Sequence, residues 1–125
     1  MTSPSEPLKV WSYARCSTCK KALAWLEQHG LSYDVIDITE SPPSRDLISA
    51  ALDSLGSRQP LFNTSGQSYR ALGSSTVKAM SDDEALDALA ADGKLMRRPF
   101  VALEDGTFLV GFKIDQWVEA LQRCS

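Results

Sequence analysis

The sequence places two cysteines, Cys16 and Cys19, on either side of two residues in the stretch CSTC. A pair at this spacing can bind a metal, form a disulfide or act as a reactive thiol pair. A zinc site needs four ligands, and the other candidates, His29 and Cys124, belong to no second paired motif. A disulfide between such near neighbours would close a loop too short to stabilise the fold much. The spacing therefore favours a redox-active pair.

The residues around the pair favour Cys16 as the nucleophile. An apolar run at 8–14 predicts a strand, and apolar residues three and four apart from Cys19 onward predict a helix. Cys16 is therefore expected where a helix begins, and unpaired N–H groups and the helix dipole stabilise a thiolate there. Arg15 adds positive charge and is a candidate substrate-binding residue. Cys19 lies one turn on along the apolar stripe, as a buried resolving thiol or simply a small core residue.

The composition is typical of one soluble globular domain. The chain has 125 residues, of which 43% are hydrophobic and 23% charged, and its net charge is −3. This acidic balance does not provide the broad basic field of a nucleic-acid-binding protein. No apolar run approaches the roughly 20 residues of a membrane span. We expect residues 1–7 to be a flexible tail, and cysteines without an export signal favour the cytoplasm.

The apolar pattern predicts the order βαβ, a helical middle and ββα. We expect strands over 8–14 and 32–38, helices over 17–30, 44–56, 81–93 and 114–121, and a hairpin over 100–112 around Asp105-Gly106. A CxxC pair that follows the first strand of a βαβ unit is typical of a thioredoxin-like fold. The predicted fold class is therefore α/β and thioredoxin-like, one domain over 1–125 with a helical insertion at about 40–95.

Capping residues mark the ends of the expected helices. Gly30 is the expected C-cap of the first helix. Ser81 and Glu84 match a capping box at the start of the helix that precedes Gly93. Gly93 is expected to end that helix.

Five segments together resemble the arsenate reductase/Spx family. They are CSTCKKA, SPPSRDLI, PLFNTSGQSYRALG, LMRRPF and VGFKIDQW, in the family's order and spacing, and the similarity extends from about Lys9 to Leu121. The resemblance implies a thioredoxin fold with a helical insertion. It also implies a cysteine at the start of the first helix that attacks arsenate, after which glutathione resolves the adduct. By position, that nucleophile is Cys16.

The resemblance also implies an oxyanion site made of three arginines that lower the thiol pKa. The arginine before the proline in LMRRPF is Arg98, and Pro99 is expected to be cis and to lie beside the thiol. The other two positions hold Asn63 and Lys113 in this chain. Arg70 is a further candidate to supply the missing charge.

The function implied by the resemblance is that of an arsenate reductase-like thiol oxidoreductase linked to glutathione or glutaredoxin. Its substrate would be a small oxyanion or a disulfide, with glutathione as co-substrate and no bound cofactor or metal. The alternative is an Spx-like regulator that binds the C-terminal domain of the RNA polymerase α-subunit and uses the cysteine pair as a redox switch. Neither interpretation requires a membrane or direct contact with nucleic acid.

Overall fold

The structure is a computed structural model that describes residues 8–103 and 106–122. The expected tail at 1–7, Asp105 of the expected hairpin turn and Cys124 lie outside these residues. Within the described chain, two parts are each compact. The part up to Asp37 and from Arg98 onward is called the sheet unit, and Ile38–Arg97 is called the helical unit.

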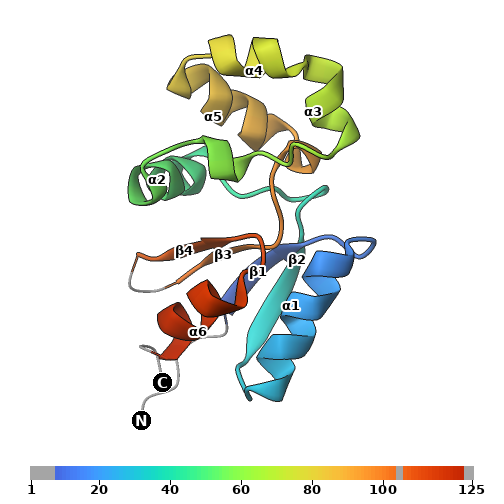
Figure 1. The fold of residues 1–125 in the computed structure, drawn as a ribbon, viewed down its shortest axis with the longest axis vertical. Helices are drawn as coiled ribbons and strands as arrows, with labels where there is room; N and C mark the ends of the chain where they lie inside the picture. The colour runs from blue at the N-terminus through green and yellow to red at the C-terminus, as the bar shows by residue number, and fades with distance from the viewer. Residues whose placement is uncertain (1–7, 104–105, 123–125) are drawn as a thin grey trace. The chain divides into compact units, whose positions relative to one another are not determined.

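The sheet unit is built on a four-stranded mixed sheet in the order β2-β1-β3-β4 (Figure 1). Its strands are β1 (Leu8–Ser12), β2 (Tyr33–Asp37), β3 (Phe100–Ala102) and β4 (Phe108–Val110). The central strand β1 is parallel to β2, with Val10 opposite Val35, and antiparallel to β3, with Trp11 opposite Phe100. The strands β3 and β4 pair antiparallel. The predicted βαβ opening and the later pair of antiparallel strands are confirmed.

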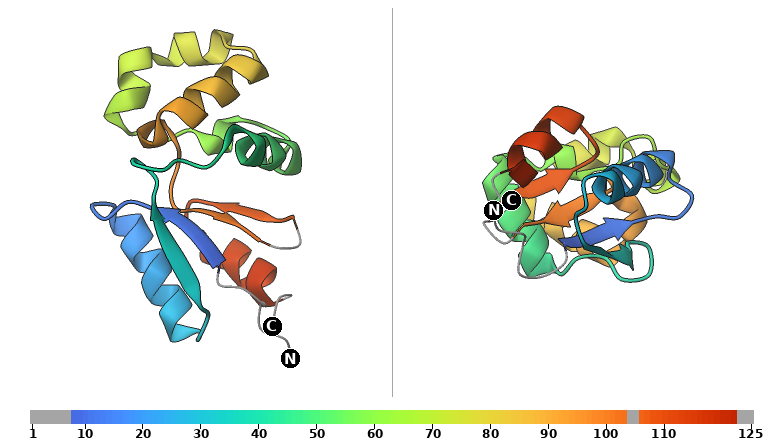
Figure 2. Two further views of the ribbon diagram at one scale, coloured as in Figure 1. Left: turned by 180° about the vertical axis from the view of Figure 1, so that it is seen from behind. Right: turned by 90° about the horizontal axis from the view of Figure 1, so that it is seen from below.

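Helices α1 (Ser17–Gln28) and α6 (Ile114–Gln122) lie against the same face of the sheet (Figures 1 and 2). Their apolar stripes and the sheet residues that face them form one core, in which Trp117 is completely buried. The Trp117 indole N–H donates to the carbonyl of Gly111 at 3.1 Å, so its polar atom is satisfied. The core residues are Leu8, Val10, Ala22, Leu26, Val101, Leu103, Leu109, Trp117, Ala120 and Leu121.

The first strand and the first helix differ from the predicted ranges at their ends. The strand stops at Ser12, because the chain turns so that the Cys16 N–H donates to the carbonyl of Tyr13 at 3.0 Å. Helix α1 ends at Gln28 with His29 as its C-cap, and Gly30 follows with a φ of 67°. Gly30 is therefore the left-handed residue just beyond the cap, a position that favours glycine.

The helical unit contains four helices and two short 3₁₀ turns, which Figure 2 shows from two further directions. They are α2 (Arg45–Leu55), η1 (Gln59–Leu61), α3 (Gln67–Leu72), α4 (Ser74–Ala79), α5 (Asp82–Ala91) and η2 (Gly93–Leu95). The unit buries its own apolar residues, among them Ile48 of α2, Leu61 of η1 and Leu89 of α5, each at 0% exposure. The described residues include no helix with the length and apolar character needed to cross a membrane.

The predicted capping box of α5 is confirmed. The Glu84 N–H donates to the Ser81 hydroxyl at 3.1 Å, and the Ser81 N–H donates to the Glu84 carboxylate at 3.0 Å. Helix α5 is also tied to α2, because Arg45 contacts Asp87 at 2.6 Å and Asp83 at 3.3 Å. These ion pairs are exposed, so we expect packing rather than charge to hold the two helices together.

Gly93 has a different role from the one predicted for it. Helix α5 ends at Ala91 with Asp92 as its C-cap, and Gly93 begins η2. The backbone carbonyl of Ile38 occupies the space that a Cβ on Gly93 would need. Gly93 therefore permits a close approach of two backbone segments within the helical unit.

Candidate active site at the start of helix α1

Cys16 is the N-cap residue of α1. Its backbone is extended, with φ −91° and ψ 115°, and its sulfur accepts the N–H of Cys19 at 3.3 Å. Ser, Thr, Asp and Asn usually fill this position, because a side-chain acceptor satisfies an N–H that the helix leaves unpaired. Here a sulfur takes that role. The arrangement exposes the sulfur to the positive end of the helix dipole.

The two sulfurs differ in acidity. Burial raises the pKa of Cys16, but the hydrogen bonds from Cys19 and the positive charge of Arg98 outweigh it, so the pKa lies below its ordinary value. Cys19 is 1% exposed, and burial raises the pKa of its thiol to about 11. Near neutral pH Cys16 is therefore the readier thiolate, and Cys19 is a thiol that can donate to it.

Arg98 lies just before β3, the strand that pairs with β1 on the side away from β2. Because Phe100 pairs with Trp11 of β1, the residues before Phe100 lie beside the loop that follows β1. The Arg98 guanidinium lies over the Tyr13 ring, 5.0 Å from its centroid, and its charge and side-chain hydrogen bond act on Cys16. The Arg98–Pro99 peptide bond is cis, as predicted.

Ser12 is a site residue that the sequence analysis missed. It is the last residue of β1, it is 4% exposed, and its hydroxyl hydrogen-bonds the Cys19 sulfur. That bond lowers the pKa of Cys19 and so opposes the effect of burial. The alternation of residues along β1 could have identified Ser12, because Leu8, Val10 and Ser12 lie on the same face of the strand. A polar side chain on a buried face needs a hydrogen-bond partner.

The structure brings together only part of the predicted set. Cys16, Cys19 and Arg98 meet at the start of α1, as described above. Arg15 and Lys113 belong to the same unit, and both are exposed; Lys113 directly precedes α6. Their roles toward a substrate stay predictions.

Asn63 and Arg70 belong to the helical unit. The Asn63 N–H donates to the carbonyl of Leu95 at 2.8 Å, and its side-chain amide lies over Gly66, where a Cβ would come within 2.8 Å of it. Arg70 is exposed in the last turn of α3. Their predicted contact with an oxyanion held at Cys16 likewise stays a prediction.

A cavity of about 260 Å³ opens beside the loop that carries Cys16. It lies between the start of α1 and the exposed edge strand β2. One of its walls is Tyr13, and the Arg98 guanidinium lies over the ring of that residue. Its lining residues are Ser12, Tyr13, Ala14, Lys20, Leu23, Val35 and Asp37. The described residues contain no group of three or more His, Cys, Asp or Glu side chains that could hold a metal ion.

Comparison with known proteins identifies relatives that match most of the chain. The ArsC family model matches residues 11–120. The uncharacterized protein YusI of Bacillus subtilis strain 168 is 43% identical over 115 residues, which cover 90% of this chain and 96% of YusI. The global transcriptional regulator Spx of Streptococcus pyogenes serotype M1 is 28% identical over 102 residues, which cover 81% of this chain and 75% of Spx.

The fold has a close counterpart among solved structures. The crystal structure of a possible arsenate reductase from Streptococcus mutans UA159 matches with a TM-score of 0.80 and 39% identity, covering 88% of this chain and 96% of that one. The thioredoxin-like α/β fold and the resemblance seen in the sequence are thereby confirmed.

Proposed function

Because this chain belongs to the ArsC family, we propose that it is an arsenate reductase-like thiol oxidoreductase whose nucleophile is Cys16. One observation carries the proposal: the Cys16 sulfur caps α1, accepts the Cys19 N–H at 3.3 Å and lies under the influence of Arg98. These groups favour the thiolate, which is the reactive form of cysteine. The cytoplasm, where thiols stay reduced, suits such a protein.

With a disulfide substrate, the Cys16 thiolate attacks one substrate sulfur and the bond between the two substrate sulfurs breaks. One half leaves as a thiolate and takes a proton from water. The other half stays joined to Cys16 as a mixed disulfide. Arg98 offsets the negative charge that spreads over the three sulfurs in the transition state.

Two thiols are available to resolve this intermediate. When glutathione attacks the substrate-derived sulfur, Cys16 leaves as a thiolate. When Cys19 attacks the Cys16 sulfur, the substrate half leaves and an internal disulfide forms, which two glutathione molecules reduce while becoming oxidised glutathione. The pKa of Cys19, raised to about 11, favours glutathione near neutral pH.

With arsenate, the Cys16 thiolate attacks As(V) and one As–O bond breaks; the oxygen takes up protons from solvent and leaves as water. A glutathione thiolate then attacks the Cys16 sulfur. The S–As bond breaks and its electron pair stays on arsenic, which becomes As(III), while Cys16 and glutathione are left joined in a mixed disulfide that a further thiol reduces. On this proposal Arg98 and Lys113, both in the sheet unit, hold the oxyanion. Lysine lacks the bidentate fork of arginine, so we expect slower turnover of arsenate than of a small disulfide.

The experiment follows NADPH consumption in the presence of glutathione, glutathione reductase and glutaredoxin, with arsenate or hydroxyethyl disulfide as the substrate. The wild type is compared with Cys16→Ser, Cys19→Ser and Thr18→Ala, the last being a matched control because Thr18 is exposed between the two cysteines. We expect the Cys16→Ser rate to fall to the protein-free background and Thr18→Ala to keep the wild-type rate. Full activity of Cys16→Ser with both substrates would refute the proposal.

The alternative function is that of an Spx-like regulator, and the similarity to Spx of Streptococcus pyogenes supports it. In that role the Cys16–Cys19 pair would switch binding to the C-terminal domain of the RNA polymerase α-subunit. A pull-down with that domain, before and after oxidation of the protein, tests it. Redox-dependent capture that Cys16→Ser abolishes would favour the regulator, and no capture in either state would exclude it.

A further inference from the structure

We propose that the helical unit carries a second site, which binds a small anion with an apolar body of about the size of a benzene ring. The site is a cavity of about 290 Å³ lined by Ser57, Arg58, Gln59, Phe62, Thr64, Tyr69, Val77 and Lys78. All of these residues belong to the helical unit, so this proposal is independent of the chemistry proposed for Cys16.

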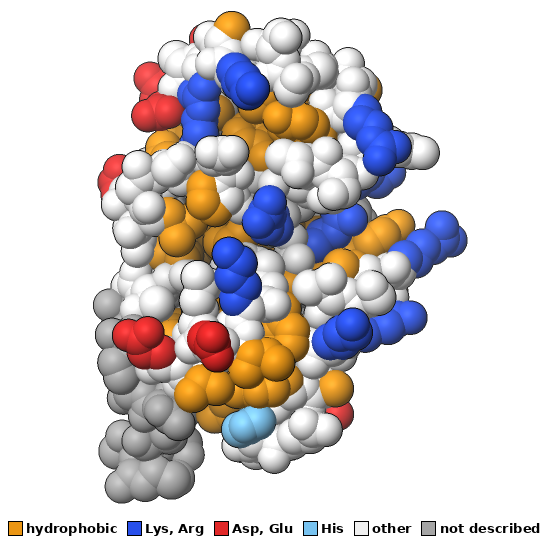
Figure 3. All heavy atoms as spheres, in the orientation of Figure 1, with side chains coloured by type: hydrophobic (Ala, Val, Ile, Leu, Met, Phe, Trp, Pro, Cys, Tyr) orange, Lys and Arg blue, Asp and Glu red, His pale blue; other side chains and the backbone are white. Residues whose placement is uncertain are grey.

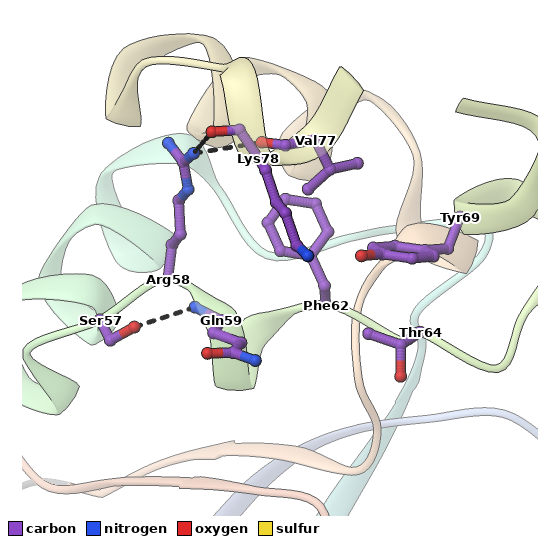
Figure 4. A pocket seen from close by; sticks show the side chains of 8 residues that line it. All are labelled: Ser57, Arg58, Gln59, Phe62, Thr64, Tyr69, Val77 and Lys78. Carbon is purple, nitrogen blue, oxygen red and sulfur yellow. Dashed lines mark hydrogen bonds between the residues drawn. The ribbon is translucent and has the colours of Figure 1, made fainter. Parts of the chain in front are cut away.

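The walls of the cavity are apolar and aromatic. Phe62 and Val77 are 2% and 5% exposed, so they form a floor beneath the opening. The ring of Tyr69 meets that of Phe62 edge to face, with centroids 6.1 Å apart (Figure 4). Figure 3 shows hydrophobic side chains at the surface of this unit with Lys and Arg side chains beside them. A volume near 300 Å³ is at the small end for ligand sites, which limits the occupant to a single ring or an equivalent aliphatic group.

The charges that line the cavity favour an anion. Two of the eight lining residues, Arg58 and Lys78, are cationic, and none is acidic. Arg58 also contacts Asp82 at 3.2 Å, but that carboxylate is 70% exposed and lies outside the lining. Among the described residues no carboxylate pairs with Lys78. Figure 4 shows its ammonium group and the Tyr69 hydroxyl pointing into the cavity.

The cavity is held open by hydrogen bonds that a ligand does not have to supply. The Arg58 guanidinium donates to the carbonyls of Val77 and Lys78 at 3.1 and 3.2 Å, and so satisfies the end of α4 (Figure 4). Next to it, the Gln59 N–H donates to the Ser57 hydroxyl at 3.2 Å. The Arg58 bonds tie the residue before η1 to the last turn of α4, and both of these segments line the cavity. A preformed site costs less ordering on binding than one that must assemble.

The arrangement assigns a part of the ligand to each wall. An anionic group meets Lys78 and the Tyr69 hydroxyl near the opening, where the ammonium and the hydroxyl can donate to it. The apolar body lies on Phe62 and Val77, where it is removed from water. A neutral molecule of the same shape loses the first contact, and a bare inorganic anion loses the second.

The experiment is an NMR titration of the full chain labelled with nitrogen-15, using benzoate, benzyl alcohol and inorganic phosphate as separate probes. We expect benzoate to give saturable amide shifts centred on Gln59, Thr64 and Lys78, with a dissociation constant of about 1–10 mM, as befits so small a probe. Benzyl alcohol and phosphate should bind at least about 3-fold more weakly, because each lacks one of the two contacts.

Two variants and a control decide the outcome. Lys78→Gln should weaken benzoate binding about 3-fold or more, and Tyr69→Ala should weaken it further by removing a wall. Lys9→Gln, an exposed lysine of the sheet unit, should leave it unchanged. The proposal is overturned if benzoate gives no saturable shifts at these amides, if Lys78→Gln binds as the wild type does, or if benzyl alcohol binds as tightly as benzoate.

Discussion

Cys16 and Cys19 carry the same thiol, and the surroundings of each sulfur move their pKa values in opposite directions. Burial acts on both sulfurs. At Cys16 it is outweighed by the hydrogen bonds from Cys19 and by Arg98, whereas at Cys19 it dominates. The difference in acidity between the two thiols therefore follows from their two neighbouring environments.

The charge of Arg98 should be measurable as a change in the acidity of Cys16. Arg98→Gln removes the cation that favours the thiolate, so the pKa of Cys16 should rise toward its ordinary value. A titration that follows thiolate absorbance in the ultraviolet measures this, with Cys19→Ser as the background so that one thiol is observed. Lys21→Gln, at an exposed lysine of α1, is the control. An equal rise in the pKa of Cys16 in that variant would mean that Arg98 lowers this pKa no more than any other nearby cation does.

The pH dependence of the internal disulfide reports on Cys19. Its raised pKa means that the thiolate fraction, and hence the rate of attack on a mixed disulfide at Cys16, should climb about tenfold per pH unit until the pH nears 11. Ser12→Ala removes a hydrogen bond that lowers this pKa, so the rate at a given pH should fall and the profile should move to higher pH.

Stopped-flow release of a chromophoric thiol from Cys16, without glutathione, measures that profile. Thr18→Ala is the control with an unchanged profile. A rate that levels off near the pKa of an ordinary thiol would contradict the effect of burial on Cys19.

At the scale of secondary structure, α1 depends on a sulfur for its N-cap. Cys16→Ser keeps a side-chain acceptor at this position, whereas Cys16→Ala removes it. We expect Cys16→Ala to lower the free energy of unfolding by about 1 kcal/mol and Cys16→Ser to leave it nearly unchanged. Urea denaturation of the reduced protein compares the two, and equal stability of both variants would show that the sulfur contributes nothing as a cap.

Gly93 and Gly66 form a matched pair of glycines for a packing test. A Cβ on Gly93 would collide with the backbone carbonyl of Ile38, whereas a Cβ on Gly66 would come too close only to the flexible side-chain amide of Asn63 and would make an ordinary contact with the Asn63 backbone carbonyl. Gly93→Ala should therefore cost about 3 kcal/mol and Gly66→Ala less than about 1 kcal/mol. Thermal or urea unfolding measures both, and similar costs would mean that the backbone near Ile38 yields easily.

Secondary structure was predictable where the sequence contains its own start and stop signals. Helix α5 begins at the predicted capping box of Ser81 and Glu84. The segment before it could be predicted only as turn-rich with short helical stretches, because α3 and α4 have six residues each and too few turns to display a period. The early end of β1 at Ser12 depends on the turn that delivers Cys16 to its cap, a local geometry that no propensity records.

At the scale of the whole molecule, the sheet unit and the helical unit each have their own buried residues, and this should appear in hydrogen exchange. Leu89→Ala, in α5, should lower the free energy of exchange by about 3 kcal/mol for amides in 38–97, and by less for amides of the sheet unit. Leu26→Ala, in α1, should have the opposite effect: the larger loss of protection should fall on amides of the sheet unit. Native-state exchange monitored by NMR measures both variants. Equal losses throughout the chain in either variant would mean that the described residues unfold as one cooperative body.

The sequence predicted those parts of the candidate site whose residues lie close together along the chain. Cys16 and Cys19 were predictable because the strand, the helix start and the spacing all lie in one short segment. Arg98 was assigned from a resemblance, and its place beside Cys16 depends on the pairing of β3 with β1 across most of the chain length. The alternation of β1 indicates that Ser12 needs a polar partner, but that this partner is the Cys19 sulfur follows only from the structure.

The cap at the start of α1 also bears on the last step of the proposed thiol–disulfide exchange. While Cys16 is joined to a substrate half, its sulfur is neutral and accepts the Cys19 N–H weakly; when the bond breaks, the returning thiolate accepts it strongly. The interactions that make Cys16 a good nucleophile thus also make it a good leaving group. On the proposed function, each release restores the cap, so the start of α1 favours the free Cys16 thiolate over the mixed disulfide.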